Sequence, residues 1–369
     1  MGCCESKQNT SSKKEITKDN FEDGVINIIK EDIGQKPNNG RYINGKYIYD
    51  DGKYYIGEFQ NNLPNGKGIK YNKNREILYD GNFINGKFEG NGKYIRENGN
   101  YYIGQWKEGL RNGKGIEYSQ NGNIIYDGEW VNDKFEGYGN FGEYYKGQFK
   151  NGLRHGKGTL YYPDGSIAYE GDFINGKFEG YGKLFMIDGA YYIGQFKNGY
   201  QNGKGTMYYP NGKILYEGDF IHDEPEGIGK SFFENGNYYI GQFKKGVPNG
   251  KGTIYYPNGN ILYEGDFVNG KKEGNGKYIL ESGEYYLGQF KNDLPNGKGK
   301  EYDLKGNFFY DGDFINGKYD GIGKEIYEDG SYYIGQFKNG LNHGKGILYY
   351  PNGKIKQKGN WVNDEFVEN

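Results

Sequence analysis

The sequence predicts an all-β protein: an elongated, single-layer antiparallel sheet of about fourteen consecutive β-hairpins that forms a twisted rod. Two observations predict it. A short pattern, Tyr-x-Gly-x-Phe followed after six further residues by Gly-x-Gly, recurs from residue 55 onward. Aromatic residues make up 18% of the chain although its mean hydropathy is −0.99. Because disordered chains are poor in aromatic residues, the two values together indicate a thin sheet rather than an unfolded chain.

The pattern occurs in fourteen copies at alternating intervals of 24 and 23 residues, apart from one interval of 19. Its third position is glycine in every copy. A flexible linker has no reason to keep glycine in phase, so the alternation predicts a repeat array whose unit is a pair of copies. The copies begin at Tyr55, Tyr79, Tyr102, Tyr126, Tyr145, Tyr169, Tyr192, Tyr216, Tyr239, Tyr263, Tyr286, Tyr310, Tyr333 and, in degraded form, Gln357.

Each copy is predicted to form one β-hairpin, as the copy that begins at Tyr192 illustrates. Tyr192, Gly194 and Phe196 alternate along the chain, so they lie on one face of a strand. Residues 198–202 have the composition of a turn, and residues 203–209 are expected to form the returning strand. A Pro-Asn-Gly turn then leads into the next copy, since glycine readily adopts the positive φ that such turns need.

Glycine within the strands is expected to have a structural partner. It normally weakens a strand because it has no side chain to pack. A neighbouring aromatic ring can lie flat over the missing side chain, an arrangement that stabilises glycine in designed sheets. The pattern therefore predicts that the repeated rings lie over the repeated glycines.

The fourth copy is four residues shorter than the others, because residues 139–144 replace a run like residues 92–101. Deletion of an even number of residues keeps each side chain on its own face of the sheet, whereas a one-residue shift would move it to the other face. We therefore expect a shorter hairpin with the register kept. The array as a whole is expected to span residues 40–369.

The extended pattern Tyr-x-Gly-x-Phe-x-x-Gly-x-x-x-Gly-x-Gly resembles the MORN repeat (membrane occupation and recognition nexus) over residues 41–369. The resemblance implies a single-layer, elongated, twisted sheet of antiparallel hairpins. It also implies scaffold roles at membranes, junctions, cilia and the cortical cytoskeleton, often as dimers. A homodimer through the C-terminal copies is therefore an expectation for this chain.

The first residues, Met-Gly-Cys-Cys-Glu-Ser, match the N-myristoylation signal M-G-x-x-x-[ST], with Gly2 as the acylated residue. One myristoyl chain gives only marginal membrane binding, and stable anchoring takes a second signal. Cys3 and Cys4 are placed to be palmitoylated, whereas the nearby lysines are diluted by acidic residues. No stretch approaches the roughly 20 apolar residues of a membrane-spanning helix, so acyl chains are the expected membrane contact.

Residues 1–39 are expected to form an acylated, largely disordered tether, because they are mostly polar. Residues 21–33 have enough apolar character for one short helix, although Gly24 lies in its interior. The same segment could equally pack on the first hairpin. Both alternatives remain open at the level of sequence.

Composition and spacing argue against most other kinds of site. A net charge of −2 provides no overall field to attract nucleic acid. Both cysteines lie outside the array, so neither disulfides nor thiolate-bound metals hold the fold. His155 and His343 occupy the same loop position in different copies, which indicates a turn role. We expect no catalytic residue, metal or cofactor, because an array repeats one surface whereas a catalytic site needs one irregular pocket.

Carboxylate pairs such as Glu217 and Asp219 recur in alternate copies. A glycosidase pair would occur once, so repetition indicates a different role. Such pairs are expected either to form a solvated face or to bind lysines of the neighbouring copy, for example Lys197 or Lys204.

The aromatic face is the candidate partner-binding surface. One reading is that its rings simply pack the sheet. The other is that a single-layer sheet leaves an aromatic stripe uncovered, and such a stripe binds an extended peptide or a helix of a partner protein. The candidate residues are Tyr102, Trp106, Tyr126, Trp130, Tyr145, Phe149, Tyr169, Phe173, Tyr192, Phe196, Tyr216, Phe220, Tyr239 and Phe243.

The favoured function is a non-enzymatic scaffold tethered by acyl chains to the cytoplasmic face of a plasma, ciliary or cortical membrane, where it binds partner proteins. One alternative is a ciliary, axonemal or cortical cytoskeleton component of the radial-spoke type. Another is a targeting or regulatory subunit of a signalling enzyme such as a lipid kinase. Both alternatives follow from the family resemblance rather than from individual residues.

Overall fold

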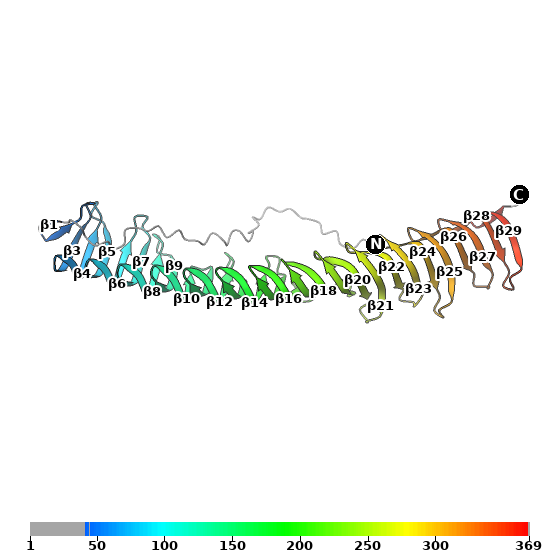
Figure 1. Ribbon diagram of the computed structural model, residues 1–369, viewed down its shortest axis with the longest axis horizontal. Helices are drawn as coiled ribbons and strands as arrows, with labels where there is room; N and C mark the ends of the chain where they lie inside the picture. The colour runs from blue at the N-terminus through cyan, green and yellow to red at the C-terminus, as the bar shows by residue number, and fades with distance from the viewer. Residues whose placement is uncertain (1–40, 44, 368–369) are drawn as a thin grey trace. The chain divides into compact units, whose positions relative to one another are not determined.

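The computed structural model describes residues 41–43 and 45–367, and these residues contain no helix. Antiparallel strands follow one another in a single layer and are joined by short turns (Figure 1). The chain divides into two compact units, which meet in the sequence between Phe178 and Glu179. The predicted all-β, single-layer antiparallel sheet is confirmed in both units.

The first unit contains thirteen complete strands and the start of a fourteenth. They are β1 (Arg41–Ile43), β2 (Lys46–Ile48), β3 (Tyr54–Gln60), β4 (Leu63–Tyr71), β5 (Ile77–Ile84), β6 (Lys87–Ile95), β7 (Tyr101–Lys107), β8 (Leu110–Tyr118), β9 (Ile124–Val131), β10 (Lys134–Phe141), β11 (Tyr145–Lys150), β12 (Leu153–Tyr161), β13 (Ile167–Ile174) and the first residues of β14 (Lys177–Phe185).

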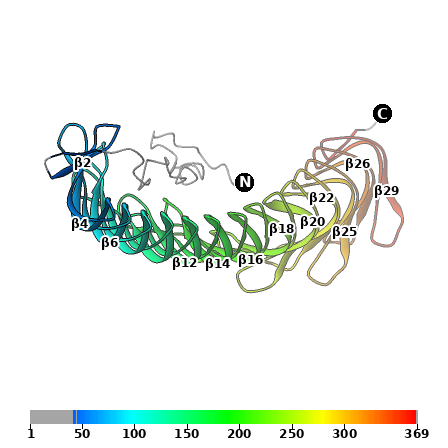
Figure 2. The same cartoon turned by 60° about the vertical axis from the view of Figure 1, so that its left-hand side comes forward.

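The second unit contains the remaining strands, which curve along their length (Figure 2). They are β15 (Tyr191–Lys197), β16 (Tyr200–Tyr208), β17 (Ile214–Ile221), β18 (Glu224–Phe232), β19 (Tyr238–Lys244), β20 (Val247–Tyr255), β21 (Ile261–Val268), β22 (Lys271–Ile279), β23 (Tyr285–Lys291), β24 (Leu294–Tyr302), β25 (Phe308–Ile315), β26 (Lys318–Ile326), β27 (Tyr332–Lys338), β28 (Leu341–Tyr349), β29 (Ile355–Val362) and β30 (Glu365–Val367).

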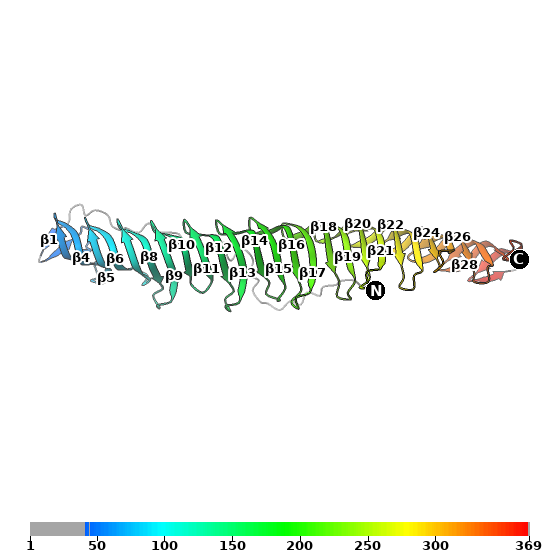
Figure 3. The same cartoon turned by 90° about the horizontal axis from the view of Figure 1, so that it is seen from below.

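Pairing is local throughout each unit. Strands that are adjacent in the sequence pair antiparallel, as in β3–β4 and β4–β5 of the first unit and β15–β16 and β16–β17 of the second. Figure 3 shows the strands of each unit lying side by side in sequence order. The array is therefore built from contacts between neighbouring hairpins, as expected of a repeat protein.

The hairpin turns are tighter than the sequence composition predicted. In the copy that begins at Tyr192, Asn198 and Gly199 both have positive φ, 54° and 89°, which is the two-residue turn that matches strand twist. The returning strand β16 therefore begins at Tyr200 and not at Gly203. The predicted turn over residues 198–202 is therefore three residues too long, because Asn198 and Gly199 alone reverse the chain.

The two glycines of each Gly-x-Gly have different roles. Gly203 lies at a β-bulge with φ 103°, a conformation that residues with a side chain rarely adopt. Gly205 lies beneath the ring of Tyr192, and a Cβ there would come within 2.4 Å of that ring. The predicted placement of rings over glycines is confirmed.

The leading tyrosines and the aromatic residues four positions later form the core of the array. In the second unit, the ring of Tyr192 meets Phe196 of its own strand at 5.2 Å and Phe220 of the next copy at 4.9 Å, both edge to face. The Tyr192 hydroxyl donates a hydrogen bond to the carbonyl of Gln195 at 3.0 Å. The same contacts recur along each unit, so every copy stabilises the next.

The shortened fourth copy keeps its register, as predicted. Gly139 of β10 opposes Gly147 of β11, just as Gly92 opposes Gly104 in a full-length pair. Side chains on both strands thus keep their faces, and the ring of Tyr126 still covers Gly139.

Candidate partner-binding face

We call the face that carries the leading tyrosines the ring face. All fourteen candidate rings, from Tyr102 to Phe243, lie on it, and none is more than 6% exposed. Within each unit they are packed against one another and against neighbouring copies. A partner on this face would therefore contact mainly the variable side chains that lie over and beside the rings.

In several copies the residue nine positions after the leading tyrosine lies against its ring, and we call this position the covering position in every copy. In the first unit Phe88 stacks on Tyr79 with ring centroids 3.7 Å apart, and Phe135 stacks on Tyr126 at 3.9 Å. The covering residues of the first unit are Pro64, Phe88, Arg111, Phe135, Arg154 and Phe178. Those of the second unit are Gln201, Pro225, Pro248, Lys272, Pro295, Tyr319 and Asn342.

A buried charge network occupies the ring face of the first unit around Arg111, which is 5% exposed. Its guanidinium lies 4.0 Å from the ring of Trp130 and donates to Asp133 at 3.0 Å and to Glu117 at 3.1 Å. Arg96 pairs with the second oxygen of Glu117 at 2.8 Å. Every charge in this network has a partner, as a buried charge requires.

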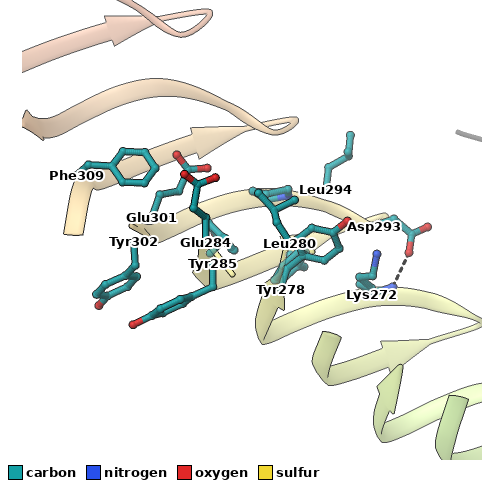
Figure 4. A pocket seen from close by; sticks show the side chains of 13 residues that line it. Lys272, Tyr278, Leu280, Glu284, Tyr285, Asp293, Leu294, Glu301, Tyr302 and Phe309 are labelled. Atoms are coloured by element: carbon teal, nitrogen blue, oxygen red, sulfur yellow. Dashed lines mark hydrogen bonds between the residues drawn. The ribbon is translucent and has the colours of Figure 1, made fainter. Parts of the chain in front are cut away.

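The ring face of the second unit has a cavity of about 370 Å³. Its wall includes the apolar and aromatic residues Tyr278, Leu280, Pro295 and Phe309 and the charged residues Lys272, Glu284, Asp293 and Glu301. Figure 4 shows Tyr278, Leu280 and Leu294 grouped on one side of the cavity and Glu284 and Glu301 on the other. A cavity with apolar walls and a few polar groups is the usual form of a binding site.

The carboxylate of Glu301 is held in this cavity by the hydroxyl of Tyr319, which donates a hydrogen bond to it. Burial, together with the nearby charge of Glu284, raises the pKa of Glu301 above its usual range. Burial likewise raises the pKa of Glu325. The negative charges of Asp364 and Glu301 raise the pKa of Glu325 further, because they repel its ionised form. This end of the ring face therefore concentrates negative charge.

The face opposite the ring face carries a second set of aromatic pairs that the sequence reasoning missed. Tyr191 and Tyr208 stack there at 4.5 Å, and the ammonium of Lys183 lies 4.5 Å from the Tyr191 ring. The signal was the repeated Tyr-Tyr doublet, whose first member must point away from the ring face. Stacked pairs of this kind are Tyr54–Tyr71, Tyr101–Tyr118, Tyr191–Tyr208, Tyr238–Tyr255, Tyr285–Tyr302 and Tyr332–Tyr349.

The recurring carboxylates also lie on the opposite face. Lys204 pairs with Asp219 at 2.9 Å, which confirms one predicted lysine partner. The pair recurs as Lys157–Asp172, Lys251–Asp266 and Lys298–Asp313. The lysines are largely exposed, so these pairs contribute little to stability.

The structure tests other predictions only over part of the chain. Gly2, Cys3, Cys4 and the predicted segment 21–33 lie outside the described residues. Among residues that are described, no group of histidine, cysteine, aspartate or glutamate side chains is arranged to hold a metal ion. No helix able to cross a membrane occurs in the same part of the chain.

Comparison with known families gives one clear match. The model of the family described as "MORN repeat" matches thirteen stretches that together cover well over half of the chain. They are residues 55–74, 79–101, 102–124, 126–141, 145–167, 169–191, 192–214, 216–238, 239–261, 263–285, 286–307, 310–332 and 333–355. No curated protein matches the chain.

Among solved structures, two matches have low sequence identity and low TM-scores. One is the E1021V mutant of the TCP10 domain of CPAP from Danio rerio, with 16% identity, a TM-score of 0.22, and coverage of 56% of this chain and 95% of that one. The other is a protein of unknown function from Bacteroides caccae, with 12% identity, a TM-score of 0.15, and coverage of 81% and 92%. At these TM-scores neither likeness supports a conclusion.

Proposed function

Because this chain belongs to the MORN repeat family, we propose that it is a non-enzymatic scaffold tethered to the cytoplasmic face of a membrane by acyl chains. Gly2 would carry a myristoyl group, and Cys3 and Cys4 would carry palmitoyl groups. Partner proteins bind along the ring face of the sheet. The membrane is a plasma, ciliary or cortical membrane.

One observation carries the scaffold role. The array repeats one framework, in which Tyr192, Gly205 and Phe196 are typical members, while the covering positions differ from copy to copy. A constant framework with variable side chains on one face provides an extended recognition surface.

The tether is tested by fractionating cells that express the wild type or Gly2→Ala. We expect the wild type in the membrane fraction and Gly2→Ala in the soluble fraction, because a palmitoyl group is added stably only where myristate first brings the cysteines to a membrane. Cys3→Ala with Cys4→Ala should give an intermediate distribution. Equal soluble fractions for wild type and Gly2→Ala would exclude the tether.

Partner binding is tested by proximity labelling from the intact chain and from Gly2→Ala. A scaffold should label a defined set of proteins, and part of that set should change when the chain leaves the membrane. A chain that stays in the pellet after detergent has dissolved the membranes would instead be a cytoskeletal component. Lipid-kinase activity in the captured material would favour a regulatory subunit.

A further inference from the structure

We propose that the cavity on the ring face of the second unit receives an arginine side chain from a partner protein, with its guanidinium on Glu301 and its aliphatic stem on Tyr278 and Leu280. The proposal rests on the proposed scaffold function and specifies the chemistry of one partner contact. It follows from a comparison of two copies that occupy equivalent places in the two units.

The chain itself shows how an arginine is held at the equivalent place in the first unit. Glu117 lies fifteen residues after Tyr102, and Glu301 lies fifteen residues after Tyr286. The two carboxylates therefore occupy the same position on the ring face of their copies, and both face a leading tyrosine across the strands, Tyr126 and Tyr310. What surrounds them differs.

Two arginines neutralise Glu117, and both are replaced around Glu301. Arg111 is at the covering position, and its counterpart in the second unit is Pro295. Arg96 pairs with Glu117 from the preceding copy, and its counterpart is Leu280. Pro295 and Leu280 both line the cavity beside Glu301. The cavity thus occupies the place that guanidinium groups fill in the first unit.

Other parts of the arginine site are present in the second unit. In the first unit the guanidinium carbon of Arg111 lies 5.8 Å from the ring centroid of Tyr102. The counterpart of Tyr102 in the second unit is Tyr286. Tyr286 and Phe309 line the cavity. Aromatic rings favour a guanidinium over an ammonium because the planar group can stack on them. The cavity therefore fits arginine better than lysine.

None of the ion pairs found among the described residues includes the carboxylate of Glu301. The cation that lines the cavity, the ammonium of Lys272, lies instead over the ring of Tyr278, 5.1 Å from its centroid. Tyr319 supplies one hydrogen bond to it, whereas a carboxylate has about four acceptor sites. The raised pKa of Glu301 has the same origin, because burial and Glu284 are not offset by a positive charge. A partner guanidinium would provide the missing donors and charge.

A second acceptor site lies further along the same face. Asn342 is 4% exposed, and its Oδ1 has no hydrogen-bond partner among the described residues, while its amide nitrogen donates to the hydroxyl of Tyr327 at 2.9 Å. Burial, together with the neighbouring carboxylate of Glu325, raises the pKa of Tyr327 to about 12. Glu325 faces Tyr310 from the side opposite Glu301. Unpaired acceptors thus continue beyond the cavity, which favours a partner rich in hydrogen-bond donors.

The occupant comes from another protein rather than from the N-terminal segment of this chain. Residues 1–40 contain no arginine.

The test selects peptides from a phage-displayed library of random dodecapeptides on the full-length chain. Selected peptides are then labelled, and their affinity is measured by fluorescence anisotropy. We expect enrichment of arginine, and at least a tenfold loss of affinity when that arginine is replaced by citrulline, its neutral isostere. The same loss is expected on the Glu301→Gln chain.

Glu264→Gln is the matched control, because Glu264 is an exposed acid of the same unit on the opposite face. It should leave the affinity unchanged. The proposal is overturned if no peptide is enriched, if citrulline binds as well as arginine, or if Glu264→Gln and Glu301→Gln weaken binding equally. In the proximity-labelling experiment, an unchanged set of labelled proteins around the Glu301→Gln chain would refute this contact and leave the scaffold function intact. Absence of any labelled protein around the wild-type chain would refute the scaffold function itself.

Discussion

The two units share one framework and differ in what lies over it. In the first unit the ring face is filled from within, by Phe88 and Phe135 on tyrosine rings and by Arg111 on Trp130. In the second unit Pro295 and Leu280 replace bulky or charged residues, and a cavity opens beside Glu301. The difference shows that the repeated residues determine the sheet, whereas the covering positions decide which parts of the ring face remain available for binding.

The largest expected effect comes from removing the internal arginine of the first unit. Arg111→Ala leaves Glu117 and Asp133 buried beside an empty space and should lower the free energy of unfolding by about 4 kcal/mol. Pro295→Ala, at the same covering position of the second unit, should cost about 1 kcal/mol or less. Urea unfolding followed by circular dichroism measures both values. Equal losses would show that the arginine network does not distinguish the units.

A framework glycine should matter equally in both units. Gly299→Ala places a methyl group within about 2.5 Å of the Tyr286 ring, and Gly115→Ala does the same at Tyr102. Overpacking of this kind should cost about 3 kcal/mol at each site. Gly306→Ala serves as the control, because its Cβ would meet no atom within 4 Å and only its positive φ is unfavourable, by about 1 kcal/mol. A tolerated Gly299→Ala would contradict the account of the framework.

High pH should unfold both units through the leading tyrosines. Burial raises the pKa of Tyr55 in the first unit and of Tyr239 in the second to about 12, from the ordinary value of 10.0. The unfolded chain then loses these protons first, so their contribution is complete below pH 10 and is lost as the pH rises toward 12. Tyrosinate absorbance and far-ultraviolet circular dichroism should therefore change together. Ionisation of all tyrosines with the sheet intact would show that the rings are not a core.

The smallest effect is expected on the opposite face, where the units are alike. Lys204→Ala removes an exposed pair with Asp219 and should change the free energy of unfolding by no more than about 0.5 kcal/mol. The same substitution at Lys157, in the first unit, should behave identically. A thermal melt at two salt concentrations measures both. A large loss in one unit only would place a functional difference on the opposite face as well.

The framework could be predicted from the sequence because each of its residues recurs in phase. Alternation placed Tyr192, Gly194 and Phe196 on one face, and the spacing put rings over glycines. The turn at Asn198–Gly199 was assigned too long, because loop composition does not show where two residues at positive φ reverse the chain.

The cavity could not be predicted in the same way. Glu301, Leu280 and Pro295 come from two different copies, and their meeting depends on the bulge and on the register between hairpins. The candidate rings were predicted either to pack the sheet or to form a contact surface, and each of them is buried against neighbouring side chains. Superposing the copies by position would have revealed that Glu117 and Glu301 are equivalent and differently surrounded.

The most direct test of the central claim returns the missing arginine to the second unit. Leu280→Arg places a guanidinium where Arg96 lies in the first unit, within reach of Glu301. The variant should fold normally by circular dichroism and bind the selected arginine peptide at least tenfold more weakly than the wild type. Unchanged affinity in a folded Leu280→Arg chain would contradict the claim that the cavity beside Glu301, which Leu280 and Pro295 leave open, is the binding site.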